Sequence, residues 1–203
     1  MFALVESGSI TKMLNGNKGI EIGGVKHPAS IFTIWSESER NAIGIYSVEI
    51  DSSNKKDEAW YNNTGITYAY DSSANKVKGT YGSATAKNIE DTKWTQAEID
   101  AGKAPEGADT NTVASEGLKT ILIRQVKTQA QAILNETDWY ITRKAEKSTA
   151  IPSSITTHRD AVRTKQADME TKITNAADTA ALEALYTFND SGVRPLGELP
   201  RLE

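Results

Sequence analysis

The sequence predicts an α+β protein built from four consecutive segments. These are a small N-terminal antiparallel β domain (1–86), an acidic linker (87–117), a helical hairpin domain with a short third helix (118–192), and an extended tail (193–203). Strand-forming residues separated by turn residues predict the first segment. Periodicity disappears between residues 88 and 117, where seven acids and two lysines give a net charge of −5. Apolar residues then recur at steps of four and seven, which indicates packed helices.

The β domain begins with apolar residues at 2–5 and 10–14, which predict short strands around a turn at Ser7-Gly8. An Asn-Gly pair between apolar runs is a strong hairpin signal, so Asn15-Gly16 predicts a turn into a return strand that starts near Ile20. His27-Pro28 ends that strand, because the residue before proline is pushed to extended geometry.

The remainder of the β domain opens with a capping box, in which Ser36 caps a helix and Glu39 reaches back to it. Gly44 should end this short helix. Three runs rich in strand formers follow, at residues 45–50, 66–70 and 76–81, and a turn separates the last two.

Three aromatic residues outside the helices are candidate interface anchors, because binding energy concentrates in such side chains. Trp60 and Tyr61 lie in the β domain, and Trp94 lies in the acidic linker. A lone tryptophan in a polar segment either docks on a neighbouring surface or anchors a partner. The sequence from Thr95 to Glu98 can cap one helical turn, and the linker is otherwise a loop that a partner orders.

The first helix of the hairpin carries the clearest periodicity in the chain. Its apolar residues follow at steps of four and so lie on one face: Leu118, Leu122, Val126, Ala130 and Leu134. A sharp break carrying Thr137-Asp138-Trp139 follows the helix.

The second helix begins after Ile151-Pro152, with Ser153 or Ser154 as its cap. Its apolar residues recur every seven positions and form a narrow seam, which predicts packing against the first helix or a partner chain: Ile155, Val162, Met169 and Ala176. Asp178 or Thr179 caps the third helix. The proline-containing tail is expected to be extended, either loose or laid across another surface.

Bulk composition excludes several functional classes. The net charge of −4 argues against non-specific binding to nucleic acid or anionic membrane. The absence of cysteine removes disulfides, thiolate nucleophiles and most structural zinc sites. No apolar run approaches the ~20 residues of a membrane span. The start of the chain lacks the pattern of a signal peptide, so we expect a protein that is soluble and not exported by a cleaved signal.

The sequence shows no constellation that carries catalysis, and it predicts no catalytic, cofactor-binding or metal-binding residues and no cofactor. Its two histidines, His27 and His158, lie in different halves of the chain. No phosphate-binding loop or metal-ligand spacing is present. Acidic residues are interleaved with the cations of the second helix, which is typical of a salt-bridged surface rather than a nucleic-acid stripe. We therefore expect a protein that is not an enzyme.

The residues around the break have two interpretations that the sequence leaves open. In the first they form the corner of a helical hairpin: Thr137 or Asp138 caps a turn, Trp139 is buried between the helices, and Arg159 and Arg163 reach Asp138 or Glu136. In this interpretation replacing Trp139 with alanine costs about 3–5 kcal/mol. In the second the same residues contact a partner directly.

The motif Leu134-Asn-Glu-Thr137-Asp138-Trp139, followed by His158-Arg159-Asp-Ala-Val162-Arg163, resembles bacteriophage tail fibre assembly proteins. Members of that family commonly carry Leu-x-x-Thr-Asp-Trp and then Tyr-Arg-x-x-Leu-Arg on the next helix. Here His158 stands for the usual tyrosine and Val162 for the usual leucine, and the family's Trp-Pro near the end is missing. The sharper match covers about a third of the chain. The wider arrangement is similar to small tail-region proteins of phages.

The resemblance implies a non-enzymatic structural protein of a bacteriophage virion, located in or next to the tail and made in the host cytoplasm. Its implied partners are other phage tail proteins in a homo- or hetero-oligomeric assembly, with no nucleic acid and no membrane. One alternative is a tail fibre assembly chaperone that is absent from the mature particle. A second alternative is a glycan hydrolase, for which the acids of residues 88–117 are the first place to look.

Overall fold

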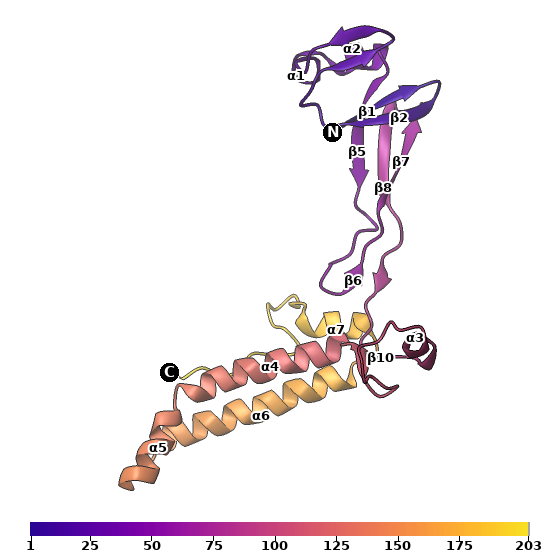
Figure 1. The fold of residues 1–203 in the computed structure, drawn as a ribbon. Helices are drawn as coiled ribbons and strands as arrows, with labels where there is room; N and C mark the ends of the chain where they lie inside the picture. The colour runs from indigo at the N-terminus through magenta and orange to yellow at the C-terminus, as the bar shows by residue number, and fades with distance from the viewer. Residues whose placement is uncertain (203) are drawn as a thin grey trace. The chain divides into compact units, whose positions relative to one another are not determined.

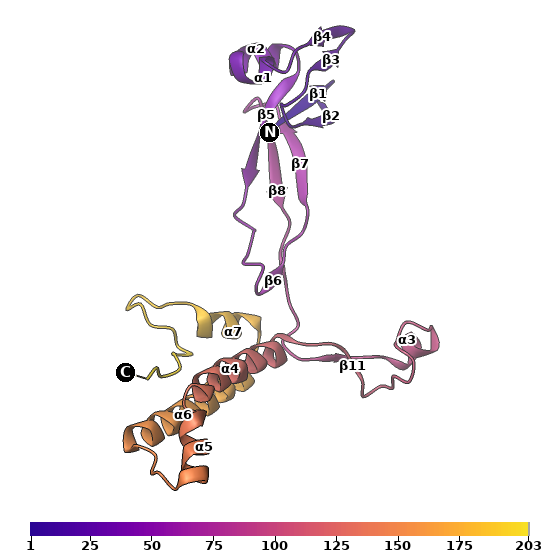
Figure 2. The same cartoon turned by 60° about the vertical axis from the view of Figure 1, so that its left-hand side comes forward.

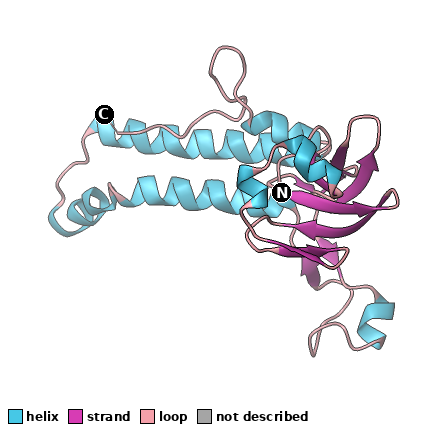
Figure 3. Ribbon diagram, turned by 90° about the horizontal axis from the view of Figure 1, so that it is seen from above, coloured by secondary structure: helices cyan, strands magenta, loops and turns pink. Residues whose placement is uncertain are grey.

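A computed structural model describes residues 1–202 and confirms the predicted α+β class (Figure 1). The chain forms two compact units, Met1–Thr85 and Ala86–Glu203. Figure 3 separates the strands from the helices by colour. None of the helices over residues 1–202 combines the length and apolar character that crossing a membrane requires.

The first unit consists mostly of short strands with two small helices. In chain order its elements are β1 (Phe2–Glu6), β2 (Ser9–Leu14), β3 (Ile20–Ile22), β4 (Val25–His27), α1 (Ile31–Ile34), α2 (Glu37–Ala42), β5 (Ile45–Asp51), β6 (Tyr61–Asn62), β7 (Ile66–Asp71) and β8 (Lys76–Tyr81), with β9 (Thr85–Ala86) at its end. Five of them form one sheet in the order β2-β1-β5-β8-β7.

The sheet is not entirely antiparallel as the sequence predicted, because β5 and β8 are parallel. The chain between them contains β6 and β7, and β7 runs antiparallel to β8. Strand β8 therefore runs in the same direction as β5. The other pairs are antiparallel, and the outer strands β2 and β7 contact each other, which curls the sheet.

The turns of the first unit confirm one prediction and correct another. Ser7 and Gly8 both have positive φ and close the β1–β2 hairpin, as predicted. Asn15-Gly16 does not close a hairpin, since β3 pairs with β4 rather than with β2. The actual turn is Gly23-Gly24, with φ of 56° and 83°. Two consecutive positive φ angles match the twist of a two-residue hairpin, and glycine adopts them without steric cost.

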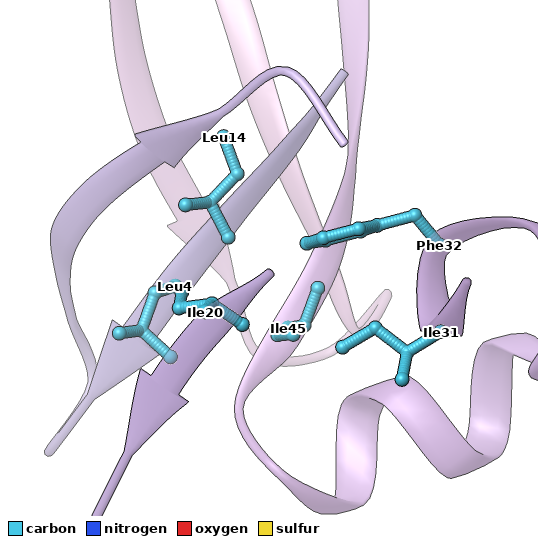
Figure 4. Packing of buried hydrophobic residues seen from close by; sticks show 6 residues of the cluster. All are labelled: Leu4, Leu14, Ile20, Ile31, Phe32 and Ile45. Carbon is cyan, nitrogen blue, oxygen red and sulfur yellow. The ribbon is translucent and has the colours of Figure 1, made fainter. Parts of the chain in front are cut away.

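The main core of this unit is formed by the sheet, β3 and α1. Figure 4 shows six buried side chains that converge there: Leu4, Leu14, Ile20, Ile31, Phe32 and Ile45. The predicted capping box is present at the start of α2, where the Ser36 hydroxyl accepts from the Glu39 N–H. Gly44, with φ of 83°, follows α2 and turns the chain into β5.

A second cluster covers the opposite face of the sheet. Ala3, Val5 and Val77 are buried there beneath half-buried tyrosines that include Tyr46 and Tyr70. The two rings lie 4.6 Å apart, and a hydrogen bond with Tyr46 raises the pKa of Tyr70. Both faces of the sheet therefore carry apolar residues, which explains how a small unit holds a core with few long elements.

The second unit contains the remaining helices and a small β ladder. Its elements are β10 (Thr92–Lys93), α3 (Gln96–Asp100), β11 (Val113–Ser115), α4 (Leu118–Asn135), α5 (Asp138–Lys147), α6 (Ser153–Asn175) and α7 (Thr179–Tyr186). Helices α4 and α6 lie side by side, and α5 follows the end of α4 (Figure 1).

The segment expected as a linker instead belongs to this second unit and contains β10, α3 and β11. We refer to residues 88–117 as the acidic arm, which leaves the start of α4 in Figure 2. Its base is tied to α4, because the Leu118 and Lys119 N–H groups donate to the carbonyls of Asn88 and Ile89 at 3.0 Å. The predicted cap is present, with the Thr95 hydroxyl accepting from the Glu98 N–H.

The helical hairpin confirms the two apolar stripes. Leu122, Val126, Ala130 and Leu134 of α4 are buried, as are Ile155, Val162, Met169 and Ile173 of α6. Neither serine predicted as the cap of α6 makes a capping hydrogen bond, and Pro152 occupies that position. The predicted break at Thr137-Asp138-Trp139 is the start of a ten-residue helix, α5, which the sequence analysis did not predict.

The end of the chain packs on its own helices rather than lying loose. Asp178 caps α7 by accepting from the Ala181 N–H at 2.8 Å, one of the two predicted caps. Leu196 is 1% exposed, and its N–H donates to the Leu185 carbonyl at 2.9 Å. Leu199 contacts the seam between α4 and α6. The tail is therefore laid across a surface of its own unit.

Candidate docking surface at the helix corner

The corner between α4, α5 and α6 is organised by one buried arginine. Arg159, on α6, is 7% exposed, and its Nη1 donates to the Leu134 carbonyl at 2.7 Å and to the Thr137 hydroxyl at 2.6 Å. Thr137 is 1% exposed and donates in turn to the same Leu134 carbonyl at 3.0 Å. Arg159 thereby adds a charged donor to a carbonyl in the last turn of α4, which also accepts from the Thr137 backbone N–H at 3.1 Å.

Asp138 completes the corner from the first position of α5. Its carboxylate lies 2.8 Å from Nη1 of Arg159 and is half-exposed. The carboxylate sits where the partial positive charge of a helix start favours an anion. Arg159 therefore links the last turn of α4 to the first turn of α5 and fixes the direction in which α5 leaves the hairpin.

Trp139 does not occupy the interior of this corner, and the prediction that it is buried between the helices is wrong. Its side chain is 51% exposed. The interior position is taken by Thr137 and Arg159, which fill it with mutually satisfied polar groups. Trp139 follows Thr137 by two residues, and side chains at that spacing on a helix do not share a face. Its ring therefore points away from the interior that Thr137 occupies.

Trp139 belongs to an ordered group of side chains on α5. Its ring lies 3.8 Å from that of Tyr140, and the Arg143 guanidinium stands over both rings at 4.7 and 5.1 Å. Ile141, two residues after Trp139 on the same helix, is 44% exposed. Stacking of this kind restricts the rotamers of large side chains, so the group presents a pre-formed aromatic surface.

Arg163 does not take part in the corner. It pairs at 3.3 Å with Asp160, three residues earlier on α6, and both side chains are largely exposed. The structure thus brings together three of the predicted motif residues, Thr137, Asp138 and Arg159, and leaves Trp139 and Arg163 outside their network.

The other candidate anchors have different environments. Trp60 and Tyr61 are 8% and 7% exposed and belong to the core of the first unit. Trp94 is half-buried in the acidic arm, where its backbone N–H donates to the Thr112 carbonyl. Trp139 is therefore the tryptophan of this set that exposes most surface to a partner.

A cleft of about 860 Å³ lies beneath the tail. Helices α4, α6 and α7 and the tail line it through residues that include Val126, Ile133, Met169, Tyr186, Leu196 and Leu199. Burial raises the pKa of Tyr186. The lining includes Leu196 and Leu199, through which the tail packs on the helices, so we assign the cleft to the packing of the tail.

Acids of the arm are held in their charged form. Hydrogen bonds from the Gly117 N–H, the Thr95 N–H and the Thr112 hydroxyl lower the pKa of Asp91, Glu98 and Asp109 respectively. A carboxyl that acts as a general acid at neutral pH needs a raised pKa instead.

Over residues 1–202 no group of three or more His, Asp or Glu side chains is placed to hold a metal ion.

Tyr140, Ile141 and Arg143 were not predicted as site residues, because α5 itself was not predicted. One signal for the helix was present: Trp139 and Arg143 are four residues apart, the spacing at which side chains meet on a helix.

Comparison of the chain with protein-family models, with characterised proteins and with solved structures finds no match.

Proposed function

We propose that this chain is a non-enzymatic structural protein of a bacteriophage particle, in or next to the tail, that works by docking onto other phage tail proteins. The observation that carries the proposal is the corner: its buried residues hold α5 so that Trp139 stays exposed. The Leu-x-x-Thr-Asp-Trp motif, which resembles that of tail fibre assembly proteins, supplies these residues.

The motif residues differ in what they contact, and this difference supports docking rather than a purely structural role. Thr137, Asp138 and Arg159 already complete the polar network of the corner. Trp139 is not part of that network, and burying its half-exposed ring against a partner is favourable because apolar surface leaves water. Aromatic residues and arginine are the side chains in which binding energy concentrates.

Protein mass spectrometry of purified particles tests the proposal. A structural component is expected in a fixed ratio to the other tail proteins, and that ratio persists through repeated purification. An assembly chaperone is abundant in the infected cell and absent from the particle. Assays of the purified chain on peptidoglycan and capsule polysaccharide test the third possibility, since degradation of either polymer contradicts the non-enzymatic assignment.

A further inference from the structure

Two segments of the second unit, attached to opposite ends of α4, carry net charges of opposite sign. The acidic arm joins the first turn of α4, and α5 follows its last turn. Helix α4 has 18 residues, which makes it about 27 Å long at about 1.5 Å per residue. The helix therefore keeps the two features apart within one chain.

The distal part of the arm, residues 95–112, is the acidic feature. It holds four acids and one lysine, a net charge of −3. Asp100 and Glu106 are exposed there and form no ion pair with any residue of 1–202. Val113, at the edge of this part, is 44% exposed, so the arm also offers apolar surface.

Residues 139–152, which we refer to as the basic tip, form the other feature. They hold three cations and one acid, a net charge of +2 in a chain whose total charge is −4. Lys144 and Lys147 are exposed and form no ion pair within residues 1–202. They lie in the last turn of α5, whose first turn carries Trp139.

We propose that the basic tip of one molecule binds the acidic arm of a second copy, so that the chain assembles head to tail. The two features match in charge and in exposed apolar surface, and α4 prevents them from meeting within one molecule. A contact between two different surfaces of identical chains repeats, and it forms a ring or an open row of subunits. This inference rests on the proposed docking function and makes a second copy of the chain one of the tail proteins that the surface around Trp139 contacts.

Sedimentation velocity of the purified full-length chain tests the inference. Assemblies larger than a monomer are expected in about 0.05 M salt, and dissociation is expected in about 0.5 M salt because ions screen exposed charges. A monomer at both salt concentrations overturns the inference. Particle incorporation is not involved, so this experiment and the test of the proposed function can fail independently.

Charge reversal locates the contact. Lys144→Glu with Lys147→Glu changes the tip, and Asp100→Lys with Glu106→Lys changes the arm. Each pair is expected to raise the dissociation constant of self-association about tenfold or more, because like charges then face each other. Lys12→Glu with Lys18→Glu, at exposed positions of the first unit, is the matched control and is expected to associate like the parent. Circular dichroism confirms that each variant is folded.

Mixing the two altered chains gives the decisive result. Each variant retains one unaltered feature, and the two altered features are themselves opposite in charge. The mixture is therefore expected to associate although neither variant does so alone. Failure of the mixture to associate, or parent-like association of either variant alone, contradicts the head-to-tail contact.

Discussion

The Arg159 guanidinium donates to the Thr137 hydroxyl across 2.6 Å, and both side chains are buried. This contact joins α6 to the residue that separates α4 from α5. It gives the Thr-Asp-Trp motif two roles at neighbouring positions, since Thr137 and Asp138 build the corner and Trp139 faces outward.

Arg159→Ala is expected to destabilise the second unit by about 2–4 kcal/mol, because hydrogen bonds to a charged group are worth about 1.5–3 kcal/mol each. The half-exposed pair with Asp138 adds little to this figure, since solvent screens it. Urea unfolding followed by far-UV circular dichroism measures the loss. Arg163→Ala is the matched control, with an expected change of about 0.5 kcal/mol or less. Equal losses in the two variants would show that Arg159 does not organise the corner.

Trp139→Ala is expected to lower the free energy of unfolding by about 1 kcal/mol or less, because half of the side chain is already in contact with water. The same measurement on the isolated chain decides between the two interpretations of the motif. A loss of about 3–5 kcal/mol, typical of a buried tryptophan, would restore the buried-corner interpretation.

Leu196→Ala is expected to cost about 2–4 kcal/mol, because the side chain is 1% exposed and its removal leaves a cavity under the tail. Leu202→Ala makes the same chemical change at a position that is 44% exposed and serves as its control. Thermal unfolding of both variants measures the difference. If the two variants melt at the same temperature, the tail does not pack on the helices.

The predictable parts of the fold are those that local rules determine. The stripe from Leu122 to Leu134 and the seven-residue seam from Ile155 to Met169 specify α4 and α6, and the structure buries both. The capping boxes at Ser36 and Thr95 are also local, since donor and acceptor lie three residues apart, and both are present.

Features that depend on distant parts of the chain were not predictable. The parallel pairing of β5 with β8 joins segments that neither strand's own sequence identifies as partners. Burial of Arg159 next to Thr137 requires the fold to bring residues 22 positions apart into contact. A charged side chain is expected at the surface by its type, whereas here the end of α4 supplies the acceptors that stabilise it inside.

Asp71 gives a test that depends on pH. Hydrogen bonds from Ser73, together with Lys78, hold the pKa of this carboxyl well below the ordinary aspartate value of 3.8. The folded-state pKa is lower than the unfolded one, so this group's contribution to stability is present above pH ~4 and is lost as the pH falls toward the folded pKa. NMR titration of the carboxyl carbon in the parent and in Ser73→Ala is expected to show a higher pKa in the variant. Titration at the ordinary value in both proteins would contradict the hydrogen-bond assignment.

Competitive incorporation tests whether the surface around Trp139 docks the chain into a phage particle. Infected cells make the parent chain and the Trp139→Ala chain together, and mass spectrometry compares the ratio of their distinct peptides in the lysate and in purified particles. Phe188→Ala, at another exposed aromatic residue, is the matched control against the parent. Particles are expected to be enriched in the parent chain relative to Trp139→Ala and to show no such preference against Phe188→Ala. Particles in which the Trp139→Ala chain keeps its lysate ratio, or from which the parent chain is absent, would contradict this expectation.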